Sequence, residues 1–199
     1  LSVQIKFKNG DESLSSKAIE LHSPSEQSIS IDVEEMRKEF GLTDVTAFEV
    51  VASAISGKVP TRVNHQLVYG SYQSALKSSI NVSLLNNENF VPPRKRGLTW
   101  GQMVFDENFE SYMGICFGSG DDEEAIVEIN FYGNGGFVKT FSQLLKPCES
   151  IILQSSDLSS IGNVGKFVWY FVKSQRVDLT VLSFHFHKKS FNASGEHSF

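Results

Sequence analysis

Two histidines near the C-terminus have a spacing that could serve metal chemistry. His185 and His187 lie two residues apart, so on an extended strand both imidazoles leave the same face. Two imidazoles can share one metal ion, but such a site needs further ligands. The neighbouring residues on that face are Val181 and Ser183, and neither supplies a further metal ligand. We therefore predict no metal site, and expect the two histidines to lie at the surface or in an interface.

An acidic run follows a glycine-rich stretch in the middle of the chain. It consists of Asp121, Asp122, Glu123 and Glu124. Clustered carboxylates can bind calcium, but this spacing does not match an EF-hand loop. The run is predicted to be a solvated loop that is available for contacts between subunits.

A basic cluster follows two prolines. It consists of Arg94, Lys95 and Arg96, the only dense group of positive side chains in the chain. Such a cluster can bind phosphate groups or an acidic patch on another subunit. We expect either a local RNA contact or a subunit contact here, and a plain surface loop is the alternative.

The chain has no arrangement of residues typical of an enzyme. No serine has the surroundings of a nucleophile elbow, and neither cysteine has a histidine context suited to nucleophilic catalysis. The glycine-rich stretch Gly133–Gly136 lacks the following helix that a phosphate-binding loop requires, so it is predicted to be a hairpin turn. We predict neither catalysis nor a cofactor.

Composition restricts the partners that the chain can have. The net charge is −5, so no global positive field would attract a nucleic acid, and any RNA contact must be local. No apolar run approaches the roughly 18–20 residues that span a bilayer, so no membrane partner is expected. The first residue is Leu1, which is compatible with release from a polyprotein by a protease or with trimming.

The elements that must position these residues are predicted to be strands. Val3, Ile5 and Phe7 alternate with polar residues, the period of a half-buried strand. Later segments show similar patterns separated by turn residues, about eleven strands in all. They are 47–55, 66–72, 80–85, 100–105, 112–117, 125–132, 150–154, 167–173 and 179–187, and a further short strand is predicted at 28–32. In the last full strand, Leu182, Phe184 and Phe186 are predicted to face the core.

One helix is predicted with its boundaries. Asp32 is a suitable N-cap, Glu35 lies at the third helical position, and Gly41 is suited to the left-handed residue that ends a helix. The sequence therefore predicts a helix from about Val33 to Phe40. Turns rather than helices join the strands, which favours an antiparallel sandwich over a parallel α/β fold. A single domain is expected over residues 1–189, followed by a flexible tail over 190–199.

The last strand pair resembles a known family. The segment Lys166–Val172 contains adjacent Trp169 and Tyr170, and leads through a short polar turn into a strand that contains Phe186. This order is similar to the closing strands of the coat proteins of secoviruses. Secoviruses are plant picorna-like viruses that include comoviruses, nepoviruses and cheraviruses. Phe131-Tyr132-Gly133 is similar to a nepovirus motif, but Asn134 departs from the arginine usual there. The length better resembles a comovirus small subunit or a cheravirus coat protein.

The resemblance implies an all-β jelly-roll sandwich with one or two short helices and a structural function. Such a subunit would assemble with related subunits into an icosahedral shell around single-stranded RNA, first in the host cytoplasm and finally in the virion. The alternative is a carbohydrate-binding β-sandwich, in which aromatics such as Trp100 and Tyr112 would stack on sugars. A hydrolase on the same fold would need an acid–base pair that we do not find in the sequence.

Overall fold

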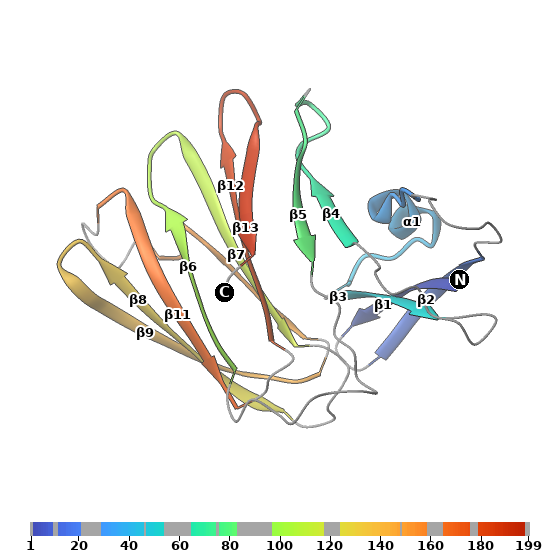
Figure 1. Cartoon of the computed structure of the whole chain (residues 1–199), viewed down its shortest axis with the longest axis horizontal. Coiled ribbons are helices and arrows are strands. Elements are labelled where there is room, and N and C mark those ends of the chain that lie inside the picture. The colour runs from blue at the N-terminus through green and yellow to red at the C-terminus, as the bar shows by residue number, and fades with distance from the viewer. Residues whose placement is uncertain are drawn as a thin grey trace. The chain divides into compact units, whose positions relative to one another are not determined.

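The chain forms two compact units, Leu1–Val63 and Asn64–Phe199 (Figure 1). This boundary falls inside the single domain predicted from the sequence. The computed structural model describes residues 2–9, 12–20, 29–45, 47–53, 65–74, 76–82, 97–117, 124–147, 149–158, 165–175 and 179–197. Within these ranges, no helix is both long enough and apolar enough to cross a membrane.

The first unit contains a three-stranded antiparallel sheet and a helix. Its strands have the order β2 (Glu12–Glu20), β1 (Ser2–Asn9), β3 (Ala47–Ser53). Strand β1 buries Val3, Ile5 and Phe7 in one small core, as their alternation predicts. Strand β2 is a sheet edge with mostly exposed polar side chains, and the sequence did not indicate it.

The helix of this unit, α1 (Val33–Glu39), has the predicted caps. The Asp32 carboxylate accepts a hydrogen bond of 2.9 Å from the Glu35 backbone N–H, which satisfies one of the free donors at the helix start. Gly41 has a φ of 64°, a left-handed conformation that glycine adopts at little cost. Met36 points from the helix into the core of the unit. The predicted helix is confirmed.

The second unit contains an antiparallel sandwich of two four-stranded sheets (Figure 1). We call the first the aromatic sheet, which has the order β6 (Gly97–Val104), β11 (Phe167–Ser174), β8 (Ala125–Gly133), β9 (Gly136–Leu145). The other, the histidine sheet, has the order β10 (Ser150–Gln154), β7 (Phe109–Phe117), β12 (Leu179–His187), β13 (Ala193–His197). A hairpin of β4 (His65–Tyr69) and β5 (Ser78–Val82) completes the described strands. The predicted all-β antiparallel sandwich is confirmed.

Both sheets contribute to one apolar core. The aromatic sheet contributes Val127 and Val168 among others, and the histidine sheet contributes Ile115 and Val181. Tyr170 is fully buried in this core, and its hydroxyl lies 2.5 Å from the Ser183 hydroxyl on the facing sheet. Because a buried polar group is costly when it is unpaired, this hydrogen bond lets the core contain two hydroxyls and ties the sheets together.

The prediction for the faces of β12 is wrong. The buried side chains of this strand are Val181, Ser183 and His185, so His185 is 7% exposed and does not lie at the surface. The predicted core residues Leu182, Phe184 and Phe186 are half-buried on the opposite face. The reason is that both faces are covered: Phe184 packs against Tyr69 of β4 with ring centroids 4.7 Å apart. The polar side chains on the inner face are tolerated because they are hydrogen-bonded: Ser183 to Tyr170, and His185 to Ser111.

The predicted flexible tail differs from the structure, because Ala193–His197 form strand β13 along β12. Gly195 lies opposite Phe184 in this pair. A Cβ at Gly195 would come within 2.5 Å of both the Ser183 carbonyl oxygen and the Tyr69 hydroxyl. The absence of a side chain therefore lets β13 lie close to the neighbouring chain segments. The predicted hairpin turn at Gly133–Gly136 is confirmed between β8 and β9.

Candidate functional site: an exposed aromatic face and a histidine pocket

The outer surface of the aromatic sheet carries a group of aromatic side chains. Alternation in β11 explains it: Val168, Tyr170 and Val172 are fully buried, whereas the residues between them point outward. The neighbouring strands carry further aromatic side chains on the same surface, at positions beside these residues. We call this group the aromatic face, and it consists of Trp100, Tyr132, Phe137, Trp169 and Phe171.

The aromatic side chains contact one another across the strands. Trp169 lies opposite Tyr132, and Phe171 lies opposite Trp100. Ring centroids are 5.9 Å apart for Trp100 and Trp169, 5.6 Å for Tyr132 and Phe171, and 5.7 Å for Tyr132 and Phe137. Trp100 is 44% exposed, Trp169 46% and Phe137 61%. A contiguous apolar surface of this kind on a folded chain commonly marks a binding site.

The polar side chains beside the aromatic face bond to one another. Thr140 donates a hydrogen bond of 2.6 Å to the Asn130 side-chain oxygen, and the Asn130 amide donates one of 2.8 Å to Glu128. Lys173 lies 3.7 Å from the same Glu128 oxygen. These groups already have partners inside the sheet. A ligand rich in hydroxyls would have to compete with those bonds, whereas an apolar protein surface would leave them intact.

Trp100 and Tyr112, the two aromatics singled out for sugar stacking, lie on different sheets. Trp100 belongs to the aromatic face. Tyr112 is half-buried in β7, where its ring packs against Phe186 at 5.8 Å. The two side chains therefore do not form one surface for a sugar. Trp100 lies instead beside the other members of the aromatic face, which the strand patterns in the sequence did not identify as neighbours.

The two charged clusters lie almost entirely outside the described residues. Arg94, Lys95 and Arg96 are outside them, as are Asp121, Asp122 and Glu123. Glu124 is described, and its exposed side chain directly precedes β8. A contact of either cluster with RNA or with another subunit stays a prediction.

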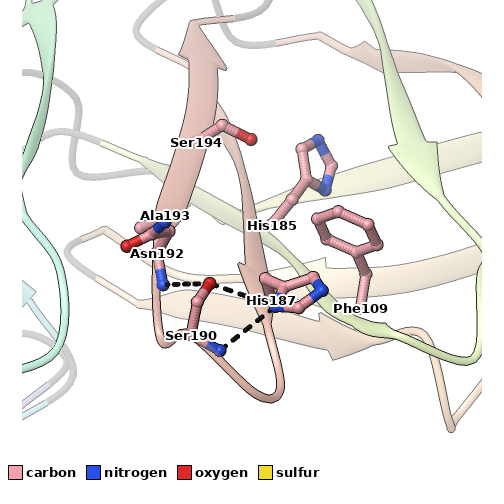
Figure 2. Close-up of a pocket in the computed structure, with 7 residues that line it drawn as sticks. All are labelled: Phe109, His185, His187, Ser190, Asn192, Ala193 and Ser194. Atoms are coloured by element: carbon pink, nitrogen blue, oxygen red, sulfur yellow. Dashed lines mark hydrogen bonds between the residues drawn. The ribbon is translucent and has the colours of Figure 1, made fainter. Parts of the chain in front are cut away.

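A pocket lies on the histidine sheet where β12 turns into β13 (Figure 2). Its volume is about 300 Å³, and its wall is formed by Phe109, His185, His187, Ser190, Asn192, Ala193 and Ser194. Both histidines singled out in the sequence thus reach one pocket. Among the described residues, no three His, Cys, Asp or Glu side chains come together in a way that could hold a metal ion.

Hydrogen bonds fix the state of the His185 ring. Its Nδ1 atom lies 2.9 Å from the Ser111 hydroxyl, which donates its own proton to the Val104 carbonyl at 2.6 Å. Since a serine hydroxyl has one proton, Ser111 must accept from a protonated Nδ1. Burial lowers the pKa of His185 below its usual 6.5, so the ring is neutral at pH 7 and its Nε2 atom carries the lone pair that can accept a hydrogen bond. Ser111 is 74 residues from His185, and no sequence signal links them.

In His187 the other ring nitrogen carries the proton. Its Nδ1 atom accepts a hydrogen bond of 3.1 Å from the Ser190 backbone N–H, and the Ser190 hydroxyl lies 3.0 Å from the same atom (Figure 2). A nitrogen that accepts from an N–H carries no proton, so neutral His187 is protonated on Nε2. That proton blocks metal binding through Nε2 in this arrangement.

Acid is expected to destabilise the protein in part through His185. The unfolded ring titrates near the usual value of 6.5, and the folded ring titrates lower, so the unfolded state binds more protons between the two values. The stability due to neutral His185 is complete above pH 6.5 and declines as the pH falls through the folded-state pKa. Urea unfolding between about pH 5 and pH 7 should show this decline, and it should be smaller in His185→Gln. An NMR titration that places the His185 pKa at or above 6.5 would contradict this account.

The chain matches no protein-family model, and no curated protein sequence matches it. One solved structure, that of Thermotoga maritima 1070, is similar to 55% of this chain and to 96% of its own length. The two sequences are 13% identical over this region, and the TM-score is 0.41. A similarity at this level carries no information about function, and the comparisons assign the chain to no family.

Proposed function

We propose that the chain is a structural capsid subunit that assembles with related jelly-roll subunits into an icosahedral shell around single-stranded RNA. The aromatic face is the observation that supports this most. Exposed, contiguous aromatic side chains are typical of the centres of protein–protein interfaces. The hydrogen-bonded polar groups beside them favour a protein surface over a hydroxylated ligand.

The motif that resembles secovirus coat proteins has two separate roles under this proposal. Tyr170 is buried and bonds to Ser183 across the sandwich, while the adjacent Trp169 is 46% exposed on the aromatic face. One residue of the pair thus stabilises the subunit, and the other is available to a neighbouring subunit. Adjacent positions on a strand suit this division, because they point to opposite faces.

Part of the strand pairing supports the jelly-roll form of the sandwich. A jelly roll has eight strands in two sheets. Its chain can be described as one long hairpin that is rolled up, so the second strand pairs with the seventh and the third with the sixth. Numbered from β6 to β13, the chain has both pairs, as β7–β12 and β8–β11. In a jelly roll the first and eighth strands also pair, whereas here β6 pairs with β11 and β13 pairs with β12, in different sheets. A hydrogen bond of 3.3 Å from the Gln102 backbone N–H to the Glu196 side chain joins β6 and β13. Strands β9 and β10 pair with β8 and β7 instead of with each other.

The charged clusters would make the remaining contacts. Arg94, Lys95 and Arg96 would bind RNA phosphates locally or meet the acidic run Asp121–Glu124 of another subunit. Exposed ion pairs contribute only about 0–1 kcal/mol each, so they would orient subunits rather than hold the shell together. We place the main interface energy in the aromatic face. The mature chain would then reside in the virion, after assembly in the host cytoplasm.

Carbohydrate binding is a second candidate function, because an exposed aromatic surface can also stack on a pyranose ring. The satisfied polar side chains around the face weaken this candidate. A glycan array distinguishes the two functions: sugar-competed binding that Trp100→Ala abolishes would favour the lectin. For the capsid, the test is electron microscopy of the chain expressed together with the capsid proteins encoded beside it, where we expect particles.

A further inference from the structure

We propose that the histidine pocket binds a small uncharged ligand rich in hydroxyl groups, such as a sugar or another polyol, through hydrogen bonds to His185 Nε2 and His187 Nε2. The pocket lies on the histidine sheet, so this site is separate from the aromatic face. The inference goes beyond shell assembly and stands or falls independently of it.

The two imidazoles offer complementary hydrogen-bonding groups to a ligand. His185 Nε2 is an acceptor, since its Nδ1 proton is held by Ser111. His187 Nε2 is a donor, since its Nδ1 accepts from Ser190. One hydroxyl of a ligand can donate to the first, and a different hydroxyl of the same ligand can accept from the second. The two residues lie about 7 Å apart along one strand face, so neighbouring hydroxyls of one molecule can reach both rings.

The rest of the pocket suits a compact molecule with both polar and apolar surface. Its volume of about 300 Å³ lies at the low end of the range for small-molecule sites, roughly 300–1,000 Å³. The Phe109 ring stands edge-on to His187 at 5.2 Å and forms an apolar wall. Such a wall can pack against the C–H surface of a sugar ring. Ser190 and Asn192 also line the pocket, but their side chains are already hydrogen-bonded: the Ser190 hydroxyl lies 3.0 Å from His187 Nδ1, and the Asn192 side-chain oxygen accepts a hydrogen bond of 2.9 Å from Ser74.

The same geometry disfavours two other classes of ligand at neutral pH. A carboxylate or phosphate would place its negative charge against the lone pair of a neutral, 7% exposed His185. A divalent metal would need the Nε2 lone pair of His187, which carries a proton while Nδ1 accepts from Ser190. The acceptor–donor pair therefore selects uncharged ligands.

The first test is the protonation pattern of the two rings. Long-range ¹H–¹⁵N NMR at pH 7 is expected to show the unprotonated nitrogen as Nε2 in His185 and as Nδ1 in His187. Ser111→Ala should remove this preference in His185 and leave that of His187 unchanged. The same tautomer in both rings would overturn the proposal.

The second test is a titration of the whole chain with methyl glucoside, methyl galactoside and methyl mannoside. At least one is expected to shift the side-chain signals of both His185 and His187. His187→Phe, which keeps a ring and removes the donor, should weaken binding about tenfold, as the loss of one hydrogen bond predicts. Trp100→Ala, on the other sheet, should bind normally.

Three results would overturn the proposal: no shift with any glycoside, equal binding by His187→Phe, or loss of binding in Trp100→Ala. Acetate and Zn²⁺ are the probes for the disfavoured classes. Tighter binding of either at pH 7 than of every glycoside would also overturn it.

Discussion

Tyr170→Ala is expected to lower the free energy of unfolding of the sandwich by about 3–5 kcal/mol, the usual cost of removing a large aromatic from a core. Tyr170 is among the largest fully buried side chains, and its hydroxyl is bonded to the buried Ser183. The substitution therefore opens a cavity and leaves a buried hydroxyl without its partner. Urea unfolding, followed by the loss of β-sheet signal in circular dichroism, measures this change.

Two variants separate the contributions to this effect. Tyr170→Phe keeps the ring and removes only the hydrogen bond, so a loss of about 1–3 kcal/mol is expected. Trp169→Ala changes the next residue of the same strand, which is 46% exposed, and should cost clearly less than Tyr170→Ala. If Tyr170→Ala and Trp169→Ala destabilise equally, the assignment of Tyr170 to the core between the sheets is incorrect.

Trp169→Glu is expected to abolish assembly while the subunit stays folded. Trp169 lies in the aromatic face next to Trp100, with ring centroids 5.9 Å apart. A carboxylate there would be buried without a partner in any interface that covers the face, and such burial costs several kcal/mol. In the free subunit the same carboxylate stays in water. Sedimentation velocity should show particles with the wild-type chain and only small species with the variant.

The matched control is Ile152→Glu, which places the same charge on an exposed apolar position of the histidine sheet. Ile152 is 64% exposed on β10. This variant should assemble as the wild type does, and circular dichroism should show that both variants are folded. Normal assembly by Trp169→Glu, or equal failure of both variants, would show that the aromatic face is not the main interface.

The sequence predicts those elements whose causes are local. The helix α1 follows from Asp32, Glu35 and Gly41, all within one short segment, and the structure contains the expected cap contacts. Strand β1 follows from the alternation of its own residues. Strands β2 and β13 were not predicted, because their side chains are largely polar and their pairing depends on a neighbouring strand.

The faces of β12 show where prediction from periodicity fails. Alternation says which residues share a face, but not which of two covered faces meets the main core. Phe184 is covered by Tyr69, far away in the sequence, while His185 is satisfied by Ser111, 74 residues away. The more apolar face was therefore assigned to the core incorrectly. Contacts between distant segments decide such cases.

The candidate site was predictable only in part. The spacing of His185 and His187 indicated that they share a face, and the structure brings both to one pocket. The opposite tautomers depend on Ser111 and Ser190, whose roles appear only in the fold. Likewise, Trp100 and Trp169 were each noticed in the sequence, but the register of β6 and β11 is what brings them together in the aromatic face.

Electron microscopy of particles tests the central proposal most directly. The chain is expressed together with the capsid proteins encoded beside it, and the purified material is imaged across a range of salt and pH. We expect icosahedral particles that contain this chain and RNA. Small, monodisperse species under all of these conditions would contradict the proposal that the chain is a capsid subunit.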